Sequence, residues 1–264
     1  MILWLNGALV EHGAARVAPD DRGFTLGDGL FETVRVKNGA LWHLHAHLAR
    51  LAAGAQVLGL PLPQVDFNAA ALTVLEKNGL SDGVVRITLS RGSGPRGVLP
   101  PAAPDPTVLI TAAPAPPPAP PARLIIARVT RRNELSPLHA VKSLNYLDNI
   151  LARQEAAAQG ADDALLLNTR GRVAESTIAN LFVVIGNMLL TPPVCEGALP
   201  GIMRAEVLRE HGSEMNLSEE DLAQAQEIFL TSSLGIRSVS HLEGRELPAT
   251  FPVAESLRAS LGLL

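Results

Sequence analysis

The feature that most constrains how this 264-residue chain can fold is a run of proline near its middle. Residues 113–121 contain six prolines in nine positions. Proline fixes its own φ angle and has no N–H, so such a run forms a stiff, extended connector. A ligand for proline-binding modules would look similar, but segments typical of strands flank the run on both sides, which favours a linker between two lobes. We therefore predict an N-terminal domain over residues 1–112, the linker at 113–121 and a C-terminal domain over 122–264.

Strand and helix patterns alternate on both sides of this linker. Asn-Gly pairs at Asn6-Gly7 and Asn38-Gly39 predict hairpin turns, residues 20–30 are too rich in Gly and Asp for a regular element, and Asp66 is the expected N-cap of a helix at 66–77. Strands are expected at residues 1–5, 8–10, 31–36, 40–44, 83–90, 106–112, 124–129, 163–167 and 227–230, and further helices at 45–60, from about 144 to 160, at 205–211 and from Ser218. These patterns predict an α/β fold of the α+β type, with a small N-terminal α/β domain and a larger C-terminal domain.

Composition and charge exclude several classes of protein. A hydrophobic content of 47% and a mean hydropathy of +0.20 suit a compact soluble enzyme, and a net charge of -4 with interspersed signs argues against a nucleic-acid partner. No apolar run approaches the roughly 20 residues that span a bilayer, and the N-terminus lacks a basic region and a cleavage site. The single cysteine, Cys195, is interpreted as a structural thiol and is typical of a reducing compartment. We therefore expect a cytoplasmic protein with no membrane partner.

Lys142 is the residue on which we expect the chemistry to depend. Of the three lysines in the chain, Lys37 and Lys77 each precede an Asn-Gly pair, which is typical of a solvated turn. Lys142 instead lies between Val141 and Leu144, where burial would favour the neutral, nucleophilic amine that forms a Schiff base. From this segment alone, a lysine at an exposed helix start is an equal alternative.

Other candidate side chains precede the linker. His43, His45 and His47 alternate as metal ligands can, but they straddle a change from strand to helix and no acidic residue or cysteine completes the set, so we expect no metal. Arg50, on the following helix, is either a solvated charge or an anion ligand. Residues 90–97 form a glycine-rich loop whose two arginines suit a carboxylate, although a flexible solvent loop would have the same composition.

Two short segments after the linker suit an anion. Gly201-Ile202-Met203 would present backbone N–H groups at a helix N-terminus, and Thr231-Ser232-Ser233 places hydroxyls and amides after a strand. Glu175 lies among small residues and is either a buried hydrogen-bond acceptor or a turn residue facing water. A reactive lysine, an anion cradle and an acid together suggest pyridoxal 5′-phosphate, with the acid keeping the pyridine nitrogen protonated.

These residues carry a resemblance to the fold-type IV class of pyridoxal-phosphate enzymes, the class IV aminotransferase family. The resemblance runs from residue 21 to residue 233: residues 142–147 resemble the family's lysine segment, 175–182 its pyridine-nitrogen segment and 199–204 its phosphate loop. It implies pyridoxal phosphate as cofactor, a small amino-bearing carboxylate as substrate and a homodimer. It assigns cofactor binding to Arg50, Lys142, Glu175, Gly201, Ile202, Met203, Thr231, Ser232 and Ser233, and substrate binding to Phe31, Thr33, Arg96 and Tyr146.

Within this class the chain most resembles 4-amino-4-deoxychorismate lyase, which releases pyruvate and forms p-aminobenzoate for folate biosynthesis. Residues 27–33 and 90–97 carry that likeness, and Met203 stands where many aminotransferases have Thr. Val98 replaces the histidine usual in D-amino-acid aminotransferases, and Tyr146 is the only tyrosine, so the N-terminal tyrosines of several aminotransferases are missing.

The alternative function is an aminotransferase acting on branched-chain or D-amino acids, whose clamp Thr231-Ser232-Ser233 resembles. In either case the family mechanism implies that Lys142 holds the cofactor, is displaced by the substrate amine and then removes the proton from the amine-bearing carbon. Thr33 and Arg96 are candidates for binding substrate carboxylates. A cofactor-binding protein without turnover is a third hypothesis, against which the intact Lys142 and Glu175 segments argue.

Overall fold

A computed structural model describes residues 1–263 of the chain, which divide into two compact units. Unit 1 comprises Met1–Pro117 together with Val141–Asn145, and unit 2 comprises Pro118–Ala140 together with the chain from Tyr146 onward. The short segment 141–145, which holds Lys142, therefore belongs to unit 1 although both of its neighbours in sequence belong to unit 2. No feature of the sequence predicts this return.

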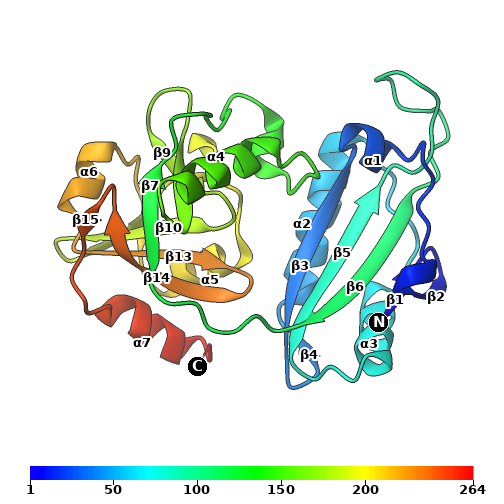
Figure 1. Ribbon diagram of the computed structural model, residues 1–264, viewed down its shortest axis with the longest axis horizontal. Coiled ribbons are helices and arrows are strands. Elements are labelled where there is room, and N and C mark those ends of the chain that lie inside the picture. Colours follow the sequence, from blue (N-terminus) through cyan, green and yellow to red (C-terminus); the bar gives the residue numbers. More distant parts are fainter. Residues whose placement is uncertain (264) are drawn as a thin grey trace. The chain divides into compact units, whose positions relative to one another are not determined.

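Unit 1 is built on a six-stranded antiparallel sheet with the order β2-β1-β6-β5-β3-β4 (Figure 1). Its elements are β1 (Ile2–Leu5), β2 (Ala8–Glu11), the 3-10 helix η1 (His12–Ala14), α1 (Arg22–Leu26), β3 (Gly29–Lys37), β4 (Ala40–Leu41), α2 (Leu44–Leu58), α3 (Phe67–Lys77), β5 (Gly83–Ser90) and β6 (Thr107–Pro114). The predicted hairpin turns are confirmed: Asn6 and Asn38 have positive φ angles of 46° and 52°, each followed by a glycine in the left-handed region. Asp66 caps α3 by accepting a hydrogen bond from Ala69 N, as predicted.

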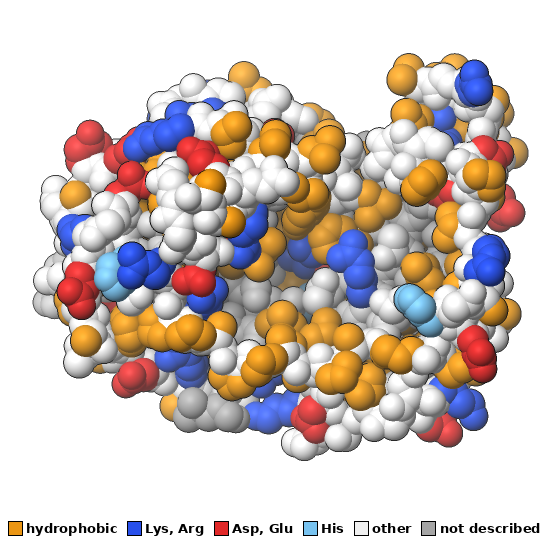
Figure 2. Space-filling model, viewed as in Figure 1, with side chains coloured by type: hydrophobic (Ala, Val, Ile, Leu, Met, Phe, Trp, Pro, Cys, Tyr) orange, Lys and Arg blue, Asp and Glu red, His pale blue; other side chains and the backbone are white. Residues whose placement is uncertain are grey.

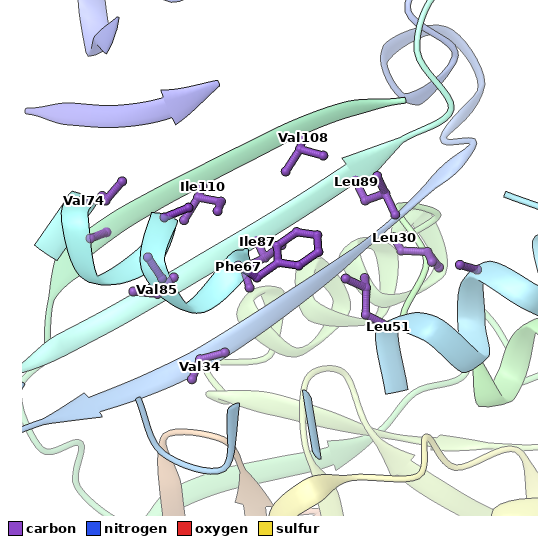
Figure 3. Packing of buried hydrophobic residues seen from close by; sticks show 14 of the residues in the cluster. Leu30, Val34, Leu51, Phe67, Val74, Val85, Ile87, Leu89, Val108 and Ile110 are labelled. Atoms are coloured by element: carbon purple, nitrogen blue, oxygen red, sulfur yellow. The ribbon is translucent and has the colours of Figure 1, made fainter. Parts of the chain in front are cut away.

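The core of unit 1 lies between one face of this sheet and the helices α2 and α3. Residues alternate along β3, so Leu30, Val34 and Val36 join the core whereas Phe31 and Thr33 lie on the opposite face. Figure 3 shows the packing of the helix residues Leu51, Phe67 and Val74 with strand residues from β3, β5 and β6. The prediction for residues 20–30 is wrong in part, because α1 forms a short helix there that Asp21 caps through Gly23 N.

Unit 2 is built on a nine-stranded mixed sheet with the order β12-β11-β10-β13-β14-β7-β8-β9, and β15 pairs with β14 beside this path. Strands β14, β7 and β8 run parallel, and β10, β13 and β14 run antiparallel. Its elements are β7 (Ala122–Ile126), η2 (Pro137–Ala140), α4 (Leu147–Ala158), β8 (Asp163–Leu167), β9 (Val173–Ser176), β10 (Asn180–Ile185), β11 (Met188–Thr191), η3 (Val194–Glu196), α5 (Ile202–Glu210), β12 (Ser213–Glu214), α6 (Glu219–Gln224), β13 (Glu227–Ser232), β14 (Gly235–Leu242), β15 (Arg245–Glu246) and α7 (Pro252–Ser260). The predicted mixed α/β fold is thereby confirmed.

Apolar side chains pack on both faces of the sheet in unit 2. Phe182 of β10 stacks on Phe229 of β13 with ring centroids 5.3 Å apart, and this pair packs with residues of α5 and α7. A separate cluster joins α4 to β7 and β8. Because both faces are covered, the central strands carry continuous apolar runs, such as Leu165–Leu167 in β8.

Helix α4 buries a different face from the one that the sequence predicted. The expected apolar face consisted of Leu144, Leu147, Ile150 and Leu151. In the structure the helix begins at Leu147, which is 75% exposed, and Ile150 and Leu151 are exposed as well. Its buried residues are Asn149, Ala152 and Ala156, because small side chains let the helix lie close to the sheet and Asn149 donates a hydrogen bond to Thr177 O at 2.6 Å. We call Leu147, Ile150 and Leu151 the leucine face of α4.

The surface mixes charged and apolar side chains. On the face in Figure 2, Lys and Arg are interspersed with Asp and Glu, and hydrophobic side chains lie between them. Within residues 1–263, no helix has the length and apolar character needed to cross a membrane.

Candidate functional site

Lys142 is attached to the first residues of β3 within unit 1. Its carbonyl accepts a hydrogen bond from Phe31 N at 3.0 Å, and Leu144 N donates to Gly29 O at 2.9 Å. Gly29 is required at this crossing, because a Cβ there would lie 2.5 Å from Leu89 O and 2.8 Å from Leu144 Cδ1. The half-buried Lys142 side chain places its Nζ 4.4 Å from the centroid of the Phe31 ring. The backbone of β3 thus fixes where the lysine lies in unit 1.

The face of the sheet opposite the helices presents a cation beside this lysine. Phe31 and Thr33 project from β3 onto that face, and Arg86 of β5 is the cross-strand partner of Thr33. The Arg86 guanidinium carbon lies 3.8 Å from the centroid of the Phe31 ring, which therefore contacts both cations. Arg86 was not predicted from the sequence, although it is a charged residue between Val85 and Ile87 in an alternating strand.

Arg50 is held by a buried carboxylate in unit 1. Its Nε and one terminal nitrogen donate to the two oxygens of Glu32 at 2.8 and 2.6 Å, and His47 Nδ1 lies 2.7 Å from Glu32 Oε2. The side chains of Glu32 and His47 are fully buried, whereas His43 and His45 are exposed. Burial alone would raise the pKa of Glu32, but hydrogen bonds from Arg50 and His47 outweigh that effect and hold this pKa below its ordinary value. No group of three His, Cys, Asp or Glu side chains in residues 1–263 is arranged to hold a metal ion.

The two arginines of the glycine-rich loop lie in different environments, because Arg91 is buried and Arg96 is exposed. Arg91 is buried and donates to Asp28 and to the carbonyls of Leu58 and Gly59, so it joins the loop to the end of α2. Burial opposes the ionisation of Asp28, but hydrogen bonds from Arg91 and Arg22 keep its pKa below the ordinary value. These hydrogen bonds hold the Arg91 side chain in the interior of unit 1.

Arg96 lies elsewhere in that loop and is exposed. The loop backbone around it is held by Arg22, which donates to the carbonyls of Gly97 and Val98 at 3.0 and 2.9 Å. Arg96 therefore projects from an anchored loop, and its role in binding a substrate carboxylate stays a prediction.

Glu175 lies on β9 of unit 2 and is buried, as the first of its two interpretations requires. Its Oε1 is 3.0 Å from a terminal nitrogen of Arg132, and its Oε2 accepts hydrogen bonds from Leu199 N at 3.0 Å and Asn180 Nδ2 at 3.2 Å. Three donors favour the ionised carboxylate, which is the form able to pair with a protonated pyridine nitrogen.

Asn180 contacts three predicted parts of unit 2: the acid Glu175, the phosphate loop and the Thr-Ser-Ser segment. Its Nδ2 also donates to Leu199 O at 2.8 Å, and in the sheet its backbone is paired with Thr231. A Cβ built on Gly201 would lie 1.9 Å from Asn180 Oδ1, so only glycine fits at the N-terminus of α5. The Asn180 side chain thus contacts the acid and the phosphate loop, and its backbone is paired with the Thr-Ser-Ser segment.

These residues of unit 2 fit an anionic ligand. The first N–H groups of α5 have no partner inside the helix. Gly201 precedes them and has no side chain that would keep a ligand away. Thr231 Oγ1 is buried without a hydrogen-bond partner in the described part of the chain, which is costly unless a ligand supplies one. Ser232 and Ser233 are half-buried beside it.

Two further predicted residues lie in unit 2. Met203 is 1% exposed, so its side chain belongs to the core and only its backbone faces the helix end. Tyr146 is half-buried and directly precedes α4. Cys195 is exposed within η3.

Comparisons with known proteins identify the family. The model of the family "Amino-transferase class IV" matches residues 29–242, so the chain belongs to the class IV aminotransferase family. The chain is 36% identical, over 93% of its length and 89% of the relative, to a Methanocaldococcus jannaschii protein provisionally named a branched-chain-amino-acid aminotransferase. It is 32% identical to the aminodeoxychorismate lyase of Vibrio harveyi, over 100% of this chain and 99% of that protein.

Solved structures agree with this assignment. The branched-chain amino acid aminotransferase of Escherichia coli superposes with a TM-score of 0.92 at 27% identity, covering 99% of this chain and 94% of that one. The 4-amino-4-deoxychorismate lyase of Pseudomonas aeruginosa superposes with a TM-score of 0.85 at 31% identity, covering 98% and 97%. The relatives therefore include both lyases and aminotransferases, and the recognition of a fold-type IV enzyme is confirmed.

Proposed function

We propose that this class IV pyridoxal-phosphate enzyme is a 4-amino-4-deoxychorismate lyase, which forms p-aminobenzoate and pyruvate. Its relatives include structures described as bound to pyridoxal phosphate and to pyridoxamine phosphate, and the buried acid and anion-binding features of unit 2 fit such a cofactor. When bound, the cofactor supplies an electron sink for the carbon that bears the substrate amine.

The roles of the protein side chains follow from their chemistry. Lys142 Nζ holds the cofactor and then removes the proton from the amine-bearing carbon, and Phe31 contacts that lysine on the face of the sheet opposite the helices. Glu175 holds a proton at the pyridine nitrogen, because its carboxylate is kept ionised by three donors. Loss of the enolpyruvyl group from the neighbouring carbon then leaves an aromatic ring, which is a large driving force for elimination.

The family resemblance assigns the phosphate to Arg50 and to two segments that follow the linker. Arg50 supplies a charge, and the backbone N–H groups of the Gly201-Ile202-Met203 turn supply dipoles. The Thr231-Ser232-Ser233 segment supplies hydroxyls, of which Thr231 Oγ1 is buried and has no hydrogen-bond partner in the part of the chain that the structure describes. The substrate carboxylates are assigned to Thr33, Arg96 and Tyr146, with Phe31 as the apolar contact.

Met203 is the observation that carries the choice of a lyase. In the first turn of α5 it offers a backbone N–H and a buried apolar side chain, where many aminotransferases offer a threonine hydroxyl. The end-to-end match with the Vibrio harveyi lyase and the absence of a tyrosine from unit 1 also support this choice.

Arg86 is the observation that favours the second candidate, an aminotransferase for branched-chain or D-amino acids. Its guanidinium lies beside Phe31 and Thr33 on the sheet face opposite the helices, where it would suit the second carboxylate of an amino-group donor such as glutamate. The Methanocaldococcus jannaschii and Escherichia coli relatives carry aminotransferase names.

A homodimer is part of this proposal. The leucine face of α4 exposes three large apolar side chains at i, i+3 and i+4, and Ile178, next to the Thr177 that contacts α4, is 60% exposed. A second copy of the chain would remove this surface from water. Sedimentation velocity should show a dimer that Leu147→Glu and Ile150→Glu shift toward monomer, whereas a wild-type monomer at all concentrations would contradict the proposal.

A paired assay on the cofactor-loaded protein tests the reaction. One arm supplies aminodeoxychorismate with no keto acid and measures p-aminobenzoate and pyruvate, which should appear in equal amounts. The other supplies L- or D-amino acids alone and follows conversion of the bound cofactor to its amine form by absorbance. Product in the first arm with little conversion in the second supports the lyase; fast conversion without p-aminobenzoate would show an aminotransferase instead.

A further inference from the structure

The arginine assigned to the phosphate forms an ion pair with a buried carboxylate, and a histidine contacts the same carboxylate. Glu32 is the only charged residue of β3 on the helix-facing side of the sheet within unit 1, and its side chain is fully buried. It contacts Arg50 and His47 from α2, one turn apart on the same helix. A buried carboxylate is costly and is kept only where its partners satisfy it closely.

The geometry of this cluster fixes the orientation of Arg50. The two oxygens of Glu32 bind Nε and a terminal nitrogen, which is the side-by-side arrangement that sets the plane of a guanidinium. Once that plane is set, the directions of all its N–H groups are set as well. A lysine in place of Arg50 would keep the charge but lose this constraint.

His47 restrains the carboxylate in turn. Its Nδ1 is 2.7 Å from Glu32 Oε2, so the proton on Nδ1 points at the carboxylate. Its Nε2 is buried without a hydrogen-bond partner in the described residues, so Nδ1 makes the only hydrogen bond of the ring within them. The histidine therefore acts on Glu32 and has no access to a ligand of its own.

We propose that Glu32 and His47 are positioning residues that fix the guanidinium of Arg50 in the orientation that binds the cofactor phosphate. The inference rests on the proposed function, which assigns that phosphate to Arg50. It goes further by identifying a buried carboxylate and a buried imidazole as determinants of affinity for the phosphate group of the cofactor.

The same two elements of unit 1 also carry Lys142. Gly54 lies one turn after Arg50 on α2, and a Cβ built on it would lie 3.2 Å from Leu30 and 3.3 Å from Val141. The lysine segment is therefore packed against α2 and hydrogen-bonded to β3, and Glu32 follows the residue that makes that hydrogen bond. Rotation of Arg50 about its pair with Glu32 would change the phosphate anchor without moving the lysine.

The experiment compares affinity for pyridoxal phosphate with affinity for pyridoxal, which lacks the phosphate, by absorbance and fluorescence titration of the cofactor-free full chain. The ratio of the two affinities measures the contribution of the phosphate alone. Glu32→Gln faces Arg50 with an amide group and should lower this ratio by about 10-fold or more, the range seen when the partner behind a metal ligand is lost. Affinity for pyridoxal should change little.

A double-mutant cycle separates positioning from general stability. In an Arg50→Ala background, Glu32→Gln should have no further effect on the ratio, because Glu32 acts only through the arginine. His47→Asn keeps an N–H donor near the position of Nδ1 and should retain more of the ratio than His47→Leu. If Glu32→Gln does not fold, Arg50→Lys tests the same point, since it keeps the charge but not the fork and should also lower the ratio.

Three results would overturn the inference. The ratio would rise in Glu32→Gln if the carboxylate competes with the phosphate, it would stay constant if orientation does not matter, and both affinities would fall together if the role is only structural. A wild-type protein with no preference for the phosphorylated form would instead contradict the proposed function itself.

Discussion

The two units hold their anion-binding groups in opposite states. In unit 1, Arg50 is already paired with a buried carboxylate, and that carboxylate is bonded to His47. In unit 2, the helix α5 begins after a glycine, and Thr231 Oγ1 is buried without a hydrogen-bond partner among residues 1–263. The first group is a charge fixed by its neighbours, and the second consists of neutral backbone and hydroxyl dipoles.

The difference follows from what each kind of group costs when it has no partner. An unpaired buried charge costs several kcal/mol, so the buried carboxylate of Glu32 requires a permanent partner such as Arg50. An unpaired hydroxyl costs about 1–3 kcal/mol, which a folded domain tolerates and a ligand can recover. The ion pair in unit 1 therefore orients the Arg50 guanidinium. The unpaired hydroxyl in unit 2 instead gains a hydrogen bond when a ligand binds, which raises the affinity for that ligand.

Lys142→Ala should give the largest effect and leave both groups intact. Turnover should fall by about 10²–10⁴-fold, because the proton transfer depends on this amine. The preference for pyridoxal phosphate over pyridoxal should persist, since neither anion-binding group is touched. Initial rates and the two titrations provide the measurement, and unchanged turnover would show that the reactive lysine has been misassigned.

Glu175→Ala should give the next largest effect, on the stability of unit 2. Removing the carboxylate leaves Arg132, whose side chain is 18% exposed, without its ion-pair partner. We expect a loss of about 2–3 kcal/mol in the free energy of unfolding of the cofactor-free protein, less than for a fully buried pair. Urea denaturation measures it, and Glu175→Gln, which keeps polar atoms near Arg132, is the control and should lose less.

Thr231→Val should have effects of opposite sign with and without cofactor. The variant replaces an unpaired hydroxyl by a methyl group of similar shape, so the cofactor-free protein should be as stable as the wild type or more stable by about 1 kcal/mol. Affinity for pyridoxal phosphate should fall by about 10-fold, because a hydrogen bond to a charged group is lost. Thermal unfolding and titration test the two halves, and a destabilised cofactor-free variant would contradict the contrast between the units.

The smallest expected effect is the acid dependence of unit 1. Glu32 has a pKa below its ordinary value of 4.5, so its contribution to stability is complete above that pH and is lost as the pH falls through the folded-state pKa. The difference in unfolding free energy between the wild type and Glu32→Gln should therefore shrink as the pH is lowered below 4.5. A difference that is independent of pH would show that Glu32 is not ionised in the native protein.

Local patterns in the sequence were sufficient for most secondary structure. The Asn-Gly turns, the cap at Asp66 and the strand at 163–167 depend on neighbouring residues only, so they could be predicted from spacing and residue type. The prediction of the buried face of helix α4 was wrong, because it also relied on spacing and residue type alone. Periodicity marks an apolar face, but it cannot show that small residues on the other face, together with Asn149, make the closer contact with the sheet.

Long-range pairing was beyond the reach of the sequence. Nothing near Lys142 indicates that it is hydrogen-bonded to β3, more than 100 positions earlier in the chain. The partner of Arg50 is likewise a glutamate 18 residues away, and Arg86 becomes notable only once Phe31 is known to lie beside it. The types of candidate residue could be inferred from the sequence, but their partners could not.

The role of Lys142 can be tested directly by locating the lysine that carries the cofactor. The chain offers only Lys37, Lys77 and Lys142, so reduction of the pyridoxal-phosphate-loaded protein with borohydride followed by peptide mass spectrometry gives an unambiguous answer. We predict one phosphopyridoxyl group per chain, on Lys142, with none on the other two lysines. Stoichiometric labelling of Lys37 or Lys77 with Lys142 unmodified would contradict it.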